Sequence, residues 1–115
     1  MEEDKKPIDF IEIQIKSFVE EMRPPTEIRD QLDIGYKYEN SVLEIYEIRP
    51  HFEIKDLIMN LSFTRTRFIK SRNIWRIYWM RASGKWELYK PNPEVEHIKD
   101  FFEIIEEDKY GCFKG

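Results

Sequence analysis

A chain of 115 residues is the size of one compact domain, and its 41% of hydrophobic residues can supply a core. Charged residues make up 37% of the chain, and no apolar run is long enough to cross a membrane. The mostly charged first dozen residues exclude a signal peptide, and a single cysteine excludes an internal disulfide. We therefore expect a soluble cytoplasmic protein with no membrane contact.

The net charge of −4 conceals a basic centre between two acidic ends. Residues 1–56 contain 8 basic and 15 acidic side chains, and residues 87–115 contain 4 and 8. Residues 57–86 contain 7 basic side chains and no acidic one. This asymmetry indicates either a surface for a polyanion or a segment whose charges pair with the acidic ends.

Apolar residues at helical spacing predict a helix over residues 7–23. The repeat consists of Ile8, Ile11, Ile15, Phe18 and Met22. Three further residues are expected to widen this apolar face, namely Phe10, Ile13 and Val19. Pro7 suits the first turn, and Pro24-Pro25 ends the helix. Packing on a sheet is the favoured interpretation, and the few heptad steps leave a homodimer as the alternative.

Period-two alternation between residues 32 and 90 predicts an antiparallel sheet of about five strands. Its central strands are residues 61–69 and 74–80. Turn-forming residues separate the strands at 39–41 and 70–73, where the chain can reverse in a hairpin.

A second helix is predicted over residues 93–109, with Asn92 as its N-cap and Pro93 at its first position. Gly111 is placed where a glycine commonly ends a helix. The order of helix, antiparallel strands and helix predicts a single α+β domain over residues 1–115, in which both helices can cover one face of the sheet.

The basic segment, residues 57–86, combines cations with aromatic rings and is the candidate binding surface. Cations neutralise phosphates, and aromatic rings stack on unpaired bases. The predicted residues for nucleic acid or another polyanion are Arg65, Arg67, Lys70, Arg72, Trp75, Trp79, Arg81 and Trp86. Alternation puts Trp75 and Trp79 on one face and Arg76 and Tyr78 on the other, and burial in the core is the favoured interpretation for these two tryptophans.

A second candidate site consists of Glu47, Arg49 and His51, with Glu44 or Glu53, in a small metal-dependent hydrolase. Strand alternation places Glu44 and Glu47 on opposite faces, so a salt bridge between Glu47 and Arg49 is the preferred interpretation. The sequence has no metal-spaced ligand set, glycine-rich phosphate loop or nucleophile motif. We therefore expect no metal and no cofactor, and we favour binding over catalysis.

Several short motifs are distributed from Arg23 to the C-terminus, namely Pro24-Pro25 with Arg29, Glu47-Ile48-Arg49-Pro50, residues 75–81, Lys85-Trp86 with Tyr89 and Pro91, and Gly111-Cys112-Phe113 with Gly115. Together they resemble a bacterial family described as domain of unknown function 3024. Lys114 and Glu87 depart from the family's pattern. The resemblance implies a small soluble bacterial protein without an established activity. It also groups Glu47, Arg49, Trp79, Arg81 and Trp86 into one constellation.

Together these patterns predict a non-enzymatic α+β domain that binds nucleic acid or another polyanion. The alternatives are the metal-dependent hydrolase and a protein-interaction module that uses its acidic helices or an exposed strand edge.

Overall fold

The computed structural model describes residues 9–114 of the chain. In chain order its elements are α1 (Phe10–Met22), a 3₁₀ turn (Thr26–Ile28), β1 (Asp33–Glu39), β2 (Val42–Pro50), β3 (Ile58–Ile69), β4 (Ile74–Met80), β5 (Trp86–Leu88), β6 (Glu94–Val95) and α2 (Ile98–Glu107). The predicted α+β class, with a helix, an antiparallel sheet and a second helix, is confirmed.

An aspartate begins α1 and two prolines end it. The Asp9 carboxylate accepts hydrogen bonds from two backbone N–H groups of the first turn, at 3.0 and 3.2 Å, and so satisfies donors that have no partner within the helix. The predicted start at Pro7 lies outside the described residues. The helix stops at Met22 because Pro24 favours extended backbone at Arg23, where ψ is 138°.

Only one face of α1 packs against the rest of the protein. Ile15, Phe18 and Val19 are buried, whereas Phe10 and Ile13 are 68% and 53% exposed. The expectation that Phe10 and Ile13 widen the buried face is wrong, because both project from the solvent side of the helix.

The strands β1 to β5 form an antiparallel meander in chain order, and β6 pairs with β4. Asn40 and Ser41 form the first hairpin turn with φ values of 52° and 65°, in the left-handed region that asparagine tolerates well. Asn73 also adopts left-handed backbone, with φ 55°, in the turn between β3 and β4. Both predicted turns are therefore present.

The start of the second helix differs from the prediction. Glu94 and Val95 do not belong to α2 but form β6, opposite Arg76 and Trp75 of β4. The Pro93 carbonyl accepts a hydrogen bond from the Ile77 N–H at 2.9 Å, which ties this segment to the sheet. Strand pairing thus overrides the local signals that favoured a helix from residue 93.

The ends of α2 are set by other residues than predicted. His97 occupies the N-cap in place of Asn92. Asp108, with φ 42°, ends the helix in place of Gly111, and its carboxylate accepts hydrogen bonds from the N–H groups of Phe113 and Lys114.

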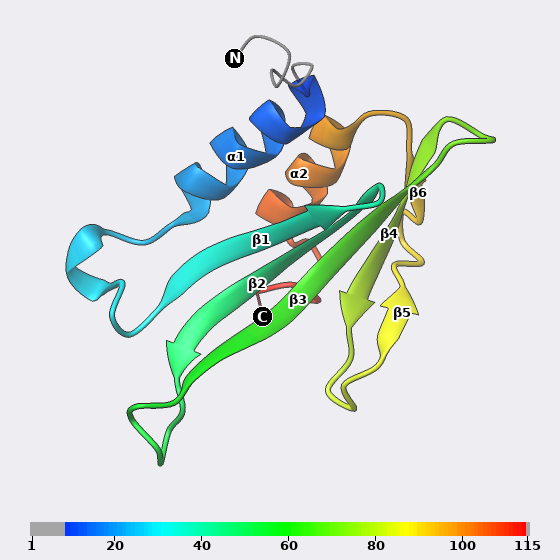
Figure 1. The fold of residues 1–115 in the computed structure, drawn as a ribbon. Helices are drawn as coiled ribbons and strands as arrows, with labels where there is room; N and C mark the ends of the chain where they lie inside the picture. Colours follow the sequence, from blue (N-terminus) through cyan, green and yellow to red (C-terminus); the bar gives the residue numbers. More distant parts are fainter. Residues whose placement is uncertain (1–8, 115) are drawn as a thin grey trace, which may run out of the picture.

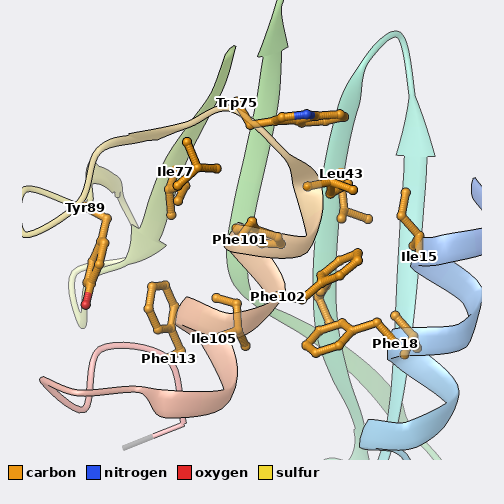
Figure 2. Close-up of a cluster of buried hydrophobic side chains, with 14 residues drawn as sticks. Ile15, Phe18, Leu43, Trp75, Ile77, Tyr89, Phe101, Phe102, Ile105 and Phe113 are labelled. Atoms are coloured by element: carbon orange, nitrogen blue, oxygen red, sulfur yellow. The ribbon is translucent and has the colours of Figure 1, made fainter. Parts of the chain in front are cut away.

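Both helices lie on the same face of the sheet (Figure 1). The core fills the space between the two layers, as Figure 2 shows for Leu43, Trp75 and Ile77 of the sheet and Phe101 of α2. Phe18 of α1 and Phe102 of α2 stack with their ring centroids 4.2 Å apart, which joins the helices to each other. No helix within residues 9–114 lies on the opposite face of the sheet.

Candidate functional site

The face of the sheet without helices, called here the uncovered face, carries two rows of side chains that cross the strands. In one row the cross-strand neighbours, from β1 to β5, are Lys37, Glu44, Arg65, Tyr78 and Leu88. In the next row, from β1 to β4 and then β6, they are Glu39, Val42, Arg67, Arg76 and Glu94. Their strand neighbours Ile45, Thr64, Thr66 and Ile77 point to the helices and are buried. Alternation along each strand therefore separates the core from a charged and aromatic surface.

Arg65 lies among aromatic rings on this face. Its guanidinium carbon is 5.9 Å from the ring centroids of both Tyr78 and Trp86. At this distance the cation is attracted by the negative faces of the rings. Its Nε is buried and has no hydrogen-bond partner among residues 9–114. On the same face, Glu44 accepts a hydrogen bond of 3.0 Å from the Ser62 hydroxyl.

Two arginines of this region share one glutamate. Glu94 accepts hydrogen bonds from Arg72 at 2.8 and 3.0 Å and from Arg76 at 3.0 Å. The hydrogen bonds from Arg72 and then Arg76 hold the pKa of Glu94 below its usual value. Two guanidinium groups against one carboxylate leave one positive charge, and Arg67 beside them adds a second.

The remaining predicted cations divide into unpaired and paired groups. Arg67 and Lys70 are exposed, and neither has an ion-pair partner in the described part of the chain. Arg81 instead pairs with Glu87 at 3.2 Å. The acidic ends thus neutralise part of the basic segment and leave the rest of its charge at the surface.

The three predicted tryptophans do not share one surface. Trp75 is 4% exposed and belongs to the core, as the favoured interpretation has it, so it is not available for stacking on a base at the surface. Trp79 lies on the same helix-covered face, partly buried against the core and opposite Glu87. Trp86 is on the uncovered face, opposite Met80.

The carboxylates of the second candidate site do not converge. Glu47 and Arg49 form an ion pair, as the preferred interpretation has it. Glu44 lies on the uncovered face, and the Nδ1 of His51 accepts hydrogen bonds of 3.1 Å from the N–H groups of Glu53 and Ile54. Among residues 9–114 no three His, Cys, Asp or Glu side chains come together as metal ligands.

Two residues of the uncovered face were missed as site residues, namely Arg76 and Tyr78. Alternation already placed both on the face opposite Trp75. Which face the helices leave open depends on how α1 and α2 pack, and the period-two pattern of β4 does not encode that choice.

No helix within the described part of the chain has the length and apolar character needed to span a membrane. Neither the curated proteins nor the solved structures include a match to the chain. One family profile does match, over residues 4–115, and so also includes the N-terminal helix, which the resemblance from Arg23 onward left out. The chain therefore belongs to the family described as Domain of unknown function (DUF3024).

Proposed function

We propose that this protein is a binding module for single-stranded nucleic acid or a related polyanion, and that the uncovered face is its binding surface. The observation that carries the proposal is that Arg65 and Arg67 lie on one sheet face together with Tyr78 and Trp86, and that no helix within residues 9–114 covers this face.

Such a surface suits a strand with unpaired bases. Every base has a flat face that can stack on an aromatic ring, and arginine and lysine neutralise the phosphates between bases. Tyr78 and Trp86 are partly exposed, so a base can reach their rings. In a duplex the base faces are hidden in the stack, so the aromatic contribution would be absent.

The charges of the surface support an electrostatic contribution of moderate size. The two rows and the adjacent turn contain Lys37, Arg65, Arg67, Lys70, Arg72 and Arg76 against Glu39, Glu44 and Glu94. The excess of cations attracts phosphates although the protein as a whole has a net charge of −4. Arg67 and Lys70 need not give up an ion pair in order to bind.

The test is fluorescence anisotropy of labelled single-stranded DNA, single-stranded RNA and duplex DNA over a series of salt concentrations. The double variant R67A/K70A removes two exposed cations of the basic segment, and K16A/K55A removes two exposed cations elsewhere as a matched control. We expect R67A/K70A to weaken single-strand binding about tenfold at low salt and to reduce the salt slope by about 1.4, for two lost phosphate contacts.

A Tyr78→Leu variant tests stacking separately from charge. We expect it to weaken single-strand binding while leaving the salt slope unchanged, because no phosphate contact is lost. No binding at low salt, or equal effects of R67A/K70A and K16A/K55A, would refute the proposal.

The cellular setting is part of the same proposal. We infer a bacterial protein of the cytoplasm that acts by binding and not by catalysis. The family resemblance supports a bacterial source, and the single cysteine agrees with a reducing compartment.

A further inference from the structure

A cavity of about 560 Å³ lies on the helix-covered side of the sheet, away from the uncovered face. The first turns of α1 and α2 meet the tips of the β1–β2 and β3–β4 hairpins there, at the end of the molecule that is uppermost in Figure 1. Its volume is in the range of small-molecule sites, which are typically about 300–1,000 Å³.

Three aromatic side chains line this cavity, from three different strands. They are Tyr38 at the end of β1, Phe68 at the end of β3 and Trp75 at the start of β4. Phe68 and Trp75 contact each other with ring centroids 5.0 Å apart and tilted by 50°. Such walls favour a flat, apolar ligand group, which buries its faces against the rings.

Trp75 also brings a polar group to the cavity. It is 4% exposed, and its ring lies at one end of the buried cluster (Figure 2). Among residues 9–114 the indole N–H makes no hydrogen bond, and the Nε of Arg65 is the one buried side-chain donor in this range that lacks a partner, so the indole N–H is accessible to solvent. A ligand in the cavity can accept a hydrogen bond from it.

The α2 side of the cavity favours negative charge. His97 occupies the N-cap of this ten-residue helix, but its side chain makes no capping hydrogen bond. The N–H groups of Ile98 and Lys99 therefore have no capping side chain, and the exposed ammonium of Lys99 lies in the first turn next to the carboxylate of Asp100. Glu96 is exposed at the rim, so an anion is favoured at these N–H groups and Lys99, away from Glu96.

The α1 side of the cavity disfavours negative charge. Tyr38 has a raised pKa, first because burial disfavours its charged form and then because Asp9 and Glu12 are close. A ligand with one anionic end is therefore oriented, with that end toward α2.

We propose that this cavity binds a small planar aromatic molecule that carries a carboxylate or a phosphate, with its ring against Tyr38 and Phe68, beside the edge of Trp75, and its anionic group at the start of α2. The proposal is independent of the function of the uncovered face, because the two sites lie on opposite sides of the sheet.

The test is NMR of full-length protein labelled with ¹⁵N in its tryptophan indole groups. The chain has three tryptophans, so Trp79→Phe and Trp86→Phe variants assign two of the indole signals and identify the third as Trp75 without a substitution at Trp75 itself. The probes are indole-3-acetate for a carboxylate and adenosine 5′-monophosphate for a phosphate. Indole, which lacks the charge, and acetate, which lacks the ring, serve as controls.

We expect the Trp75 signal to shift saturably with at least one of the two anionic probes, while the Trp86 signal stays in place. Lys99→Glu should weaken that binding about tenfold, and Lys16→Glu, an equal change of an exposed residue that does not line the cavity, should leave it unchanged. A response to only one probe distinguishes carboxylate from phosphate.

Two results would overturn the proposal. One is a Trp75 signal that no probe moves saturably up to millimolar concentration. The other is an equal effect of Lys99→Glu and Lys16→Glu, which would mean that the anion is not held at the start of α2.

Discussion

Arg67 of β3 and Arg76 of β4 lie directly opposite each other on the uncovered face. Like charges in this relationship repel and destabilise a sheet. Glu94 binds Arg76 and so offsets part of this repulsion, whereas Arg67 has no ion pair among residues 9–114. An anion that binds between the two guanidinium groups would offset more of it.

A first prediction follows for Glu94. Glu94→Gln frees Arg72 and Arg76 from their shared carboxylate, so we expect single-stranded nucleic acid to bind roughly two- to threefold more tightly at low salt. Glu106→Gln, which removes one exposed carboxylate from α2, is the matched control. Equal anisotropy titrations of the two variants would contradict the prediction.

The same glutamate contributes to stability in a pH-dependent manner. Its pKa is lower in the folded protein than in the unfolded chain, so its contribution is present above the unfolded pKa and is lost as pH falls through the folded one. The difference in urea midpoint between wild type and Glu94→Gln should therefore shrink below about pH 4.5.

A second prediction concerns the ion pair between Arg23 and Asp33, which anchors the segment after α1 to β1. The Nε and Nη2 of Arg23 donate hydrogen bonds of 2.9 Å to the two carboxylate oxygens, and these bonds lower the pKa of Asp33. We expect Asp33→Asn to reduce the free energy of unfolding by about 1–2 kcal/mol at pH 7. The loss should diminish as pH falls below about 4, where Asp33 of the unfolded chain begins to accept a proton, and vanish once pH passes below the lowered pKa of Asp33 in the folded protein.

Urea denaturation at pH 7 and pH 3 measures both expectations for Asp33. Asp30→Asn alters an exposed neighbour and should change stability by less than about 0.5 kcal/mol. A deficit in Asp33→Asn that is as large at pH 3 as at pH 7 would show that the ion pair is not its cause.

A third prediction compares two phenylalanines, each of which lies in a helix. Phe101 of α2 is fully buried, whereas Phe10 of α1 is 68% exposed. Phe101→Ala should cost about 3–5 kcal/mol of stability, because it removes buried apolar surface and leaves a cavity. Phe10→Ala should cost less than about 0.5 kcal/mol in the same urea denaturation. Similar losses in the two variants would mean that α2 does not pack as described.

A fourth prediction concerns Gly35, over which the ring of Tyr46 lies on the neighbouring strand. A Cβ at Gly35 would be 2.7 Å from Cε1 of that ring, closer than van der Waals contact allows. Gly35→Ala should therefore destabilise the protein by about 1–2 kcal/mol. In a Tyr46→Leu background the same change should be neutral or stabilising, since alanine otherwise suits a strand better than glycine. A double-mutant cycle gives the coupling, and additive effects would contradict it.

Local patterns predicted the strands and both hairpin turns because alternation and turn residues act within a few positions of one another. Asn40, Ser41 and Asn73 adopt left-handed backbone where the sequence placed turns. The start of α2 was not predictable in this way. Its signals at Asn92 and Pro93 are genuine local preferences, but hydrogen bonds to β4, about 17 residues earlier in the chain, outweigh them.

In the candidate site, too, local patterns predicted some features, and contacts between distant segments determined the others. Alternation separated Trp75 from Arg76 correctly, and the position of Arg65 and Arg67 on one face follows from their spacing. Alternation did not predict the ion pairs of Arg72 with Glu94 and of Arg81 with Glu87. Both glutamates lie on other segments, and only the pairing of those segments with β4 brings the glutamates close to the arginines.

The edge of β4 that faces away from β3 is covered by two segments from later in the chain. β5 covers residues 78–80 of that edge and β6 covers residues 75 and 76, while Ile77 between them bonds to both Pro93 and Tyr89. Two short segments thus protect an edge that neither could cover alone. During synthesis from the N-terminus, this edge of β4 can pair with other chains until residue 95 has emerged from the ribosome. The segment that leads into α2 therefore also reduces the tendency of the nascent sheet to aggregate, because it covers the part of β4 that β5 leaves open.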